Sequence, residues 1–420
     1  MQVGEMSYFC EQIIVDYMRI LVLFLLFIFV MLSGCGNRNN PKISKNDSQF
    51  LDDNVDSIEN GMDDTDRIYF LDFEQILTKE DTFRINSIAK NITFIPLETS
   101  DSALLYSEAF KIEKMNERYL VSSASLSAYH YIMTFDSAGN FIDYLMKRGQ
   151  GPRELPYITE WYVNQNVQLL VASSSYQIVL HSFENNTFNK YTLGGYYPNI
   201  SLLNDGTIVG MPTAFGKGDT VTPYLHFINQ EGKIVRSLYY SQKRNIDYDF
   251  PEGEIKGILE RYRLYQSYSG DVLFQEMFND TIYRISSMDE VDPHIIQYRG
   301  SLTPTLKDMN NPITNPQKVF ISQILDTKKY FIISYRYRGT VYTAIWDKQT
   351  FSLIANTKHG GSFGVNGTTK YRTPTGKEIF IRISNYIDDN LYCVLDAEQA
   401  MDFLPNIKED DNPILMVIDL

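Results

Sequence analysis

Cysteine, tryptophan and histidine are scarce in this chain, whose 420 residues include 3 Cys, 2 Trp and 5 His. Cys10, Cys35 and Cys393 are too few for a disulfide framework and show no CxxC spacing for zinc or redox chemistry. Basic residues are also outnumbered, because 38 Lys and Arg stand against 52 Asp and Glu, which gives a net charge of -14. Nucleic-acid binding needs clustered Lys and Arg that replace counterions, so we expect no nucleic-acid partner.

Tyrosine and phenylalanine, in contrast, are abundant. The chain contains 30 Tyr and 25 Phe, and 44% of its residues are hydrophobic. This composition is sufficient for a large packed core and excludes a wholly disordered chain. Because aromatic residues favour pleated, half-buried surfaces, the composition predicts an all-β domain that is stabilised by packing.

The beginning of the chain indicates export. The apolar run from Ile20 to Leu32 is shorter than the about 20 residues of a spanning helix and suits the hydrophobic region of a secretory signal. Because a signal peptide begins with a basic region and residues 1–17 contain acids and no base, Met18 is the better start.

The segment after the signal is acidic. Residues 46–66 contain eight acids and no base. They also contain too few apolar residues to offset the entropy cost of ordering the chain, so we expect this segment to be disordered. We therefore divide the chain into a signal peptide (1–34), a lipidated cysteine with an acidic disordered tether (35–66) and a folded domain (67–420).

The four residues from Leu32 to Cys35 resemble the lipobox of bacterial lipoproteins. In that family the signal is cut before the cysteine, whose thiol carries a diacylglyceryl group, so the resemblance implies a lipid on Cys35 that attaches the protein to a membrane of the cell envelope. The alternative is an uncleaved anchor helix with an incidental cysteine. The residues after Cys35 lack the acidic run that resembles a surface-export signal of Bacteroidetes lipoproteins, which favours a location facing the periplasm.

The folded part repeats a pattern of four short strands. Pairs of apolar runs separated by a turn, which is the hairpin signal, begin at Ala109, Ile158, Ile200, Tyr265, Val319 and Ile379. Most are followed by a second such pair, and a recurring four-stranded meander predicts a six-bladed β-propeller. The sixth repeat lacks an outer pair, so Asn91 to Thr99 and Pro413 to Leu420, at the two ends, should pair and close the ring. A pair of β-sandwiches is the alternative fold.

Three features carry a resemblance to a known family. They are the lipobox, the run ITFIPLET from Ile92, and the turn KRGQGP from Lys147 to Pro152. Together they resemble the uncharacterised six-bladed β-propeller lipoproteins of Bacteroidetes, which are similar to NHL-repeat propellers. Later repeats lack a second GQGP turn. The resemblance implies the propeller fold and brings no established activity.

Motifs for catalysis and metal binding are weak. The run from Gly360 to Gly364 matches G-x-S-x-G, but the residues that follow are rich in Gly, Thr and Pro where a nucleophile elbow needs a helix, which favours a flexible loop between blades. The histidines His130, His181, His226, His294 and His359 fall on none of the predicted first strands, which line the axis, so we predict no metal and no cofactor. The competing class is a propeller lyase, lactonase or glycan-cleaving enzyme, which three or more His, Asp or Glu side chains converging on the channel would favour.

The longest connections all join the fourth strand of one blade to the first strand of the next. They are Ser241 to Leu264, Ser301 to Lys318 and Asn356 to Lys377. By strand alternation they emerge on one face, where insertions often build a binding surface. These segments and their shorter equivalents carry Tyr and Arg side chains suited to recognition: Arg148, Arg153, Tyr157, Tyr196, Tyr197, Arg244, Tyr248, Arg261, Tyr262 and Arg263. We expect a non-catalytic propeller that binds a protein, peptide or glycan through this face. The same side chains could instead pack the connections onto the ring, and a structural spacer would show no cavity.

Overall fold

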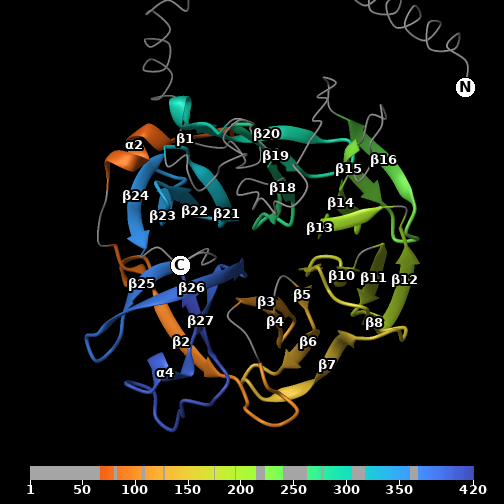
Figure 1. Ribbon diagram of the computed structural model, residues 1–420, viewed down its shortest axis with the longest axis horizontal. Helices are drawn as coiled ribbons and strands as arrows, with labels where there is room; N and C mark the ends of the chain where they lie inside the picture. Colours follow the sequence, from red (N-terminus) through yellow and green to blue (C-terminus); the bar gives the residue numbers. More distant parts are fainter. Residues whose placement is uncertain are drawn as a thin grey trace, which may run out of the picture. The chain divides into compact units, whose positions relative to one another are not determined.

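The structure is a computed structural model that describes residues 67–79, 83–105, 109–125, 128–174, 176–193, 195–213, 223–239, 263–275, 279–304, 317–359 and 368–420. The predicted all-β class is confirmed, because these residues form six small sheets in a ring, which is a six-bladed β-propeller (Figure 1). The signal peptide, Cys35 and the acidic tether lie outside the described residues. Of the described helices, none has the length and apolar character that crossing a membrane requires.

The first three blades follow one another along the chain. Blade 1 contains β3 (Ala109–Met115), β4 (Arg118–Ser125), β5 (Ala128–Tyr129), β6 (Tyr131–Phe135), β7 (Phe141–Arg148) and β8 (Glu154–Leu155). Blade 2 contains β9 (Glu160–Asn164), β10 (Leu169–Ser174), β11 (Gln177–Ser182) and β12 (Thr187–Thr192). Blade 3 contains β13 (Tyr196–Leu202), β14 (Ile208–Thr213), β15 (Pro223–Ile228) and β16 (Ile234–Tyr239).

Of the other three blades, blades 4 and 6 each include one strand from the beginning of the folded domain. Blade 4 contains β17 (Arg263–Gln266), β18 (Val272–Gln275), β19 (Thr281–Ile285), β20 (Val291–Tyr298) and β1 (Tyr69–Asp72). Blade 5 contains β21 (Phe320–Asp326), β22 (Tyr330–Tyr337), β23 (Thr340–Asp347) and β24 (Ser352–His359). Blade 6 contains β25 (Thr368–Arg372), β26 (Glu378–Ile387), β27 (Asn390–Leu395), β28 (Ile414–Asp419) and β2 (Asn91–Pro96). The short helices are α2 (Phe73–Thr78), η3 (Ile85–Ser87), η4 (Gly300–Leu302) and α4 (Ala397–Ala400).

The six predicted hairpins are confirmed as antiparallel pairs. They are β3 with β4, β9 with β10, β13 with β14, β17 with β18, β21 with β22, and β26 with β27. The predicted closure of the ring is confirmed as well, since β2 pairs with β28 from Asn91 opposite Asp419 to Pro96 opposite Ile414. The two ends of the domain therefore complete one blade, and no exposed edge is left between them.

Strand β1 and helix α2 were not predicted. Strand β1 pairs in parallel with β20 at the outer edge of blade 4. Tyr69, Leu71, Phe73 and Ile76 are fully buried in the core cluster shared by blades 4 and 5. Helix α2 begins where the Asp72 side chain accepts a hydrogen bond from the Gln75 backbone N–H at 3.1 Å. The chain thus joins the ring at blade 4 before it reaches β2 in blade 6.

Apolar side chains fill the spaces between neighbouring blades, as strand alternation requires. Trp161 of β9 is fully buried against blade 1, and its indole N–H donates to Ser122 Oγ at 2.9 Å. Polar bonds also link first strands to one another, as where Ser201 Oγ of β13 donates to Gln266 Oε1 of β17 at 2.8 Å. These contacts hold the six first strands in fixed positions around the axis.

Candidate functional site

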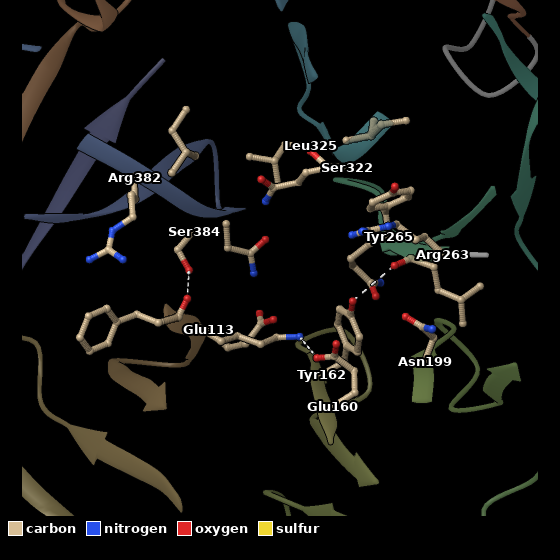
Figure 2. A pocket seen from close by; sticks show the side chains of 18 of the residues that line it. Glu113, Glu160, Tyr162, Asn199, Arg263, Tyr265, Ser322, Leu325, Arg382 and Ser384 are labelled. Carbon is tan, nitrogen blue, oxygen red and sulfur yellow. Dashed lines mark hydrogen bonds and ion pairs between the residues drawn. The ribbon is translucent and has the colours of Figure 1, made fainter. Parts of the chain in front are cut away.

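The first strands of blades 1 to 5, and β26 in the same role in blade 6, line one cavity of about 340 Å³ (Figure 2). Its walls come from β3, β9, β13, β17, β21 and β26, with Tyr129 of β5 and Val394 of β27. On three of these strands the lining begins at or next to the first residue, at Phe110, Glu160 and Arg263. The cavity, which we call the axial pocket, therefore lies toward the end of the axis where the first strands begin. The connections from the preceding fourth strands lead to this same end.

Bulges in three first strands shape the wall of the axial pocket. The register shifts between Tyr196 and Asn199 in β13, between Ile321 and Gln323 in β21, and between Ile383 and Asn385 in β26. Asn199, Ser322, Gln323, Ser384 and Asn385 all line the pocket. A bulge turns a side chain away from its regular alternation, so these polar groups reach the cavity although neighbouring positions face the core.

A half-buried ion pair joins blades 1 and 2 at the pocket wall. Lys111 Nζ lies 2.6 Å from Glu160 Oε1, with 14% and 21% of the two side chains exposed. The ammonium also lies 3.4 Å from the centre of the Tyr162 ring. Burial lowers the pKa of the Lys111 ammonium, but the carboxylates of Glu160 and Glu113 outweigh it, so the pKa ends above its ordinary value. Lys111 is therefore charged and already neutralised by Glu160.

Glu113 lies two residues further along β3 and, unlike Lys111, is mostly uncharged at pH 7. Only 5% of this residue is exposed. Burial raises the pKa of the Glu113 carboxyl from its ordinary 4.5 to about 8, and Lys111 opposes the rise only in part. Glu113 is therefore mostly protonated at pH 7 and adds a neutral hydrogen-bonding group to the pocket.

Tyrosines supply the other large side chains of this wall. The Tyr162 hydroxyl donates to the Leu264 carbonyl oxygen at 3.4 Å, so a side chain from blade 2 reaches blade 4 (Figure 2). Burial raises the pKa of both Tyr129 and Tyr162. Both hydroxyls thus remain protonated over the physiological range and can donate hydrogen bonds.

Two arginines lie on opposite sides of the pocket in Figure 2. Arg382 forms an ion pair with Asp396, with Nη2 3.3 Å from Oδ1. Arg263 differs, because its Nε is buried and has no hydrogen-bond partner, and no carboxylate of the described residues pairs with it. Gln323 Oε1 is likewise buried and without a hydrogen-bond partner in the described part of the chain. Two residues of the lining thus carry a buried donor and a buried acceptor that protein groups leave unused.

The residues of the predicted binding face that the structure describes differ in position and exposure. Arg148 and Arg153 are exposed beside blade 1, and the Arg153 guanidinium lies 4.7 Å from the centre of the Phe188 ring. Tyr157 is half-buried. Tyr197 is 1% exposed and hydrogen-bonded to His226 Nδ1 at 2.6 Å, so it packs in the core between blades 2 and 3 and is not a surface contact. The side chain of Tyr196 and all of Arg244, Tyr248, Arg261 and Tyr262 lie outside what the structure describes. Of the members of the set whose side chains the structure describes, Arg263 is the one that lines the axial pocket.

The histidines follow the predicted positions, since four lie on third or fourth strands and His130 lies between β5 and β6. Burial lowers the pKa of His359 to about 4, and its Nε2 is 3.0 Å from Thr343 Oγ1. Within the described ranges, no three His, Cys, Asp or Glu side chains gather as a metal site would require. The G-x-S-x-G run at 360–364 lies outside these ranges.

Sequence reasoning did not single out Lys111, Glu113 and Glu160. A signal was nevertheless present, because all three are charged residues in predicted first strands, where core positions are expected. Charges placed in such strands indicate a polar axis more directly than Tyr and Arg in the connections do.

The ring of six sheets, each of four to six strands, around a polar axial pocket defines this chain as a six-bladed β-propeller. The chain belongs to the family described as a domain of unknown function, DUF4934, whose model matches residues 68–419. The predicted membership in an uncharacterised propeller family with Bacteroides relatives is thereby confirmed.

Comparison with solved structures finds similar chains. A Bacteroides fragilis protein described as exported is 16% identical with a TM-score of 0.60, over 84% of this chain and 99% of that one. A DUF4221 member from Bacteroides vulgatus is 12% identical with a TM-score of 0.48, over 79% and 96% of the two chains. Virginiamycin B lyase from Staphylococcus aureus is 10% identical with a TM-score of 0.40, over 79% and 99%. Comparison with curated proteins gives no match.

Proposed function

We propose that this protein is an exported, lipid-anchored propeller of the cell envelope that binds a small polar ligand in the axial pocket and does not catalyse a reaction. The observation that carries the proposal is the pocket itself. It is built by six first strands and lined by side chains with unused hydrogen-bonding atoms. Concave sites with a few convergent polar groups are the usual places for small ligands.

The signal sequence and lipobox support the envelope location, as does the description of the Bacteroides fragilis relative as exported. Lipidation of Cys35 would place the propeller at the membrane surface, with the acidic segment 35–66 as the tether. We propose that the propeller faces the periplasm.

Binding is favoured over catalysis by the charges at the axis. A propeller enzyme was expected to bring three or more His, Asp or Glu side chains together at the channel. The described lining contains two, Glu113 and Glu160. Glu160 is engaged by Lys111, which leaves Glu113 without a second free carboxylate as a catalytic partner.

The test is a screen of water-soluble fragments by ligand-observed NMR, on the full chain in detergent. Asn199→Trp would fill the axial pocket from β13, because Asn199 is a half-buried lining residue. Lys233→Trp is the control, since Lys233 is exposed on the β15 to β16 turn of the same blade. We expect hits that Asn199→Trp abolishes and Lys233→Trp preserves. A complete lack of hits, or hits that survive both substitutions, would contradict the proposal.

A further inference from the structure

The unused atoms of the axial pocket indicate what its ligand must contain. A buried polar atom without a partner costs free energy, and native structures seldom keep one unless something else satisfies it. Arg263 Nε is a charged donor, so its missing partner is an acceptor. Gln323 Oε1 is an acceptor, so its missing partner is a donor. The two residues come from adjacent blades, on β17 and β21, and line the same cavity.

The charge of the lining indicates the sign and size of the ligand's charge. Lys111 is neutralised by Glu160, and Arg382 by Asp396. Glu113 is mostly protonated at pH 7 because burial raises its pKa to about 8. Among the described residues of the lining, this leaves Arg263 as the one positive charge without a carboxylate partner. A monocarboxylate carries one negative charge, whereas a phosphate monoester carries about 1.5 to 2 and would leave the site net negative.

We propose that the ligand of the axial pocket is a small hydroxy monocarboxylate, whose carboxylate binds Arg263 and whose O–H donates to Gln323. Arg suits this role because its planar guanidinium can make two parallel hydrogen bonds to a carboxylate. The ligand is small because the cavity holds only about 340 Å³. This inference rests on the proposed binding function and specifies its ligand.

Matched pairs of acid and amide test the charge requirement. Lactate with lactamide is the smallest pair and glucuronate with glucuronamide the largest, and inorganic phosphate is the competing anion. Affinities are measured by isothermal titration on the full chain. We expect at least one acid to bind about 10- to 100-fold more tightly than its amide, the range for one charged hydrogen-bonded contact. Phosphate should bind more weakly than that acid.

Two arginine variants locate the contact. Arg263→Gln should remove the preference for the acid, while Arg118→Gln should preserve it, because Arg118 is exposed at the start of β4 and is not among the described lining residues of the pocket. Arg263→Lys, which keeps the charge and loses the planar fork, should retain part of the preference. Equal melting temperatures of the variants and the parent would show that folding is intact.

The outcomes separate this inference from the proposed function. Fragments that bind the pocket without any preference for acids, or a preference that survives Arg263→Gln, would overturn the carboxylate assignment and leave pocket binding standing. Phosphate binding more tightly than every acid would overturn it as well. If no fragment, acid or amide binds the parent protein, both the inference and the proposed function are wrong.

Discussion

The parent protein should lose stability as the pH rises, and Glu113→Gln should abolish this loss. The folded state holds the pKa of Glu113 at about 8, against an ordinary 4.5. Between these values the unfolded chain has released the proton and the folded chain still binds it. The unfolded state therefore binds fewer protons, so the free energy of unfolding falls as pH rises through this window and levels off above pH 8. The amide of glutamine has nearly the shape of the protonated carboxyl and does not titrate.

The size of the effect follows from the two pKa values. Each pH unit in the window corresponds to about 1.4 kcal/mol, so the whole window is worth on the order of 5 kcal/mol. Between pH 6 and pH 8 the free energy of unfolding of the parent protein should fall by roughly 2 kcal/mol relative to that of Glu113→Gln. Other titrating groups are common to both proteins and cancel in this difference.

Urea unfolding at pH 6, 7 and 8 measures the difference, with the fluorescence of the buried Trp161 and Trp346 as the signal. Glu117→Gln is the matched control, because Glu117 is exposed on the turn of the same hairpin and should leave the pH profile unchanged. A difference between Glu113→Gln and the parent that stays constant from pH 6 to pH 8 would refute the reasoning. Glu113 would then already be ionised in the folded protein.

Two further predictions concern closure of the ring and the membrane anchor. Deleting Ile414 to Leu420 removes β28 from between β27 and β2, so the ring should lose its cooperative thermal transition and its protease resistance. A truncated protein that melts like the parent would show that this blade is dispensable. Cys35→Ser should abolish labelling by a lipid precursor and release the protein from membranes. Retention on membranes with an uncut signal would instead support an anchor helix.

The hairpins could be predicted because their signals are local. Turn residues such as Gly139, Gly206, Gly232 and Gly270 have positive φ between β-branched and aromatic runs, and this chemistry is visible in the sequence. Strand β1 could not be predicted in the same way. It has four residues, pairs in parallel with β20 and depends on a partner more than 200 residues away in the chain. Its place is therefore set by packing in blade 4 and not by its own pattern.

The candidate site was predicted only in part, for a related reason. Arg263 was selected because it lies in the predicted connection from Ser241 to Leu264, and it does line the axial pocket. Ser322 and Ser384 could not be selected, because each is the extra residue of a bulge, and a bulge is fixed by the register between two strands. The protonated state of Glu113 likewise depends on burial that its neighbours in sequence do not reveal.

Binding at the axis should be coupled to the integrity of the ring. Each first strand contributes to the wall of the pocket, so the complete site exists only when six blades have closed. A ligand held between Arg263 on blade 4 and Gln323 on blade 5 would therefore bind the folded ring and not the unfolded chain. Ligand at 100 times its Kd would stabilise the folded state by about 2.7 kcal/mol, whichever blade first opens. The closure where β2 meets β28 would gain as much from the ligand as the blades that touch it.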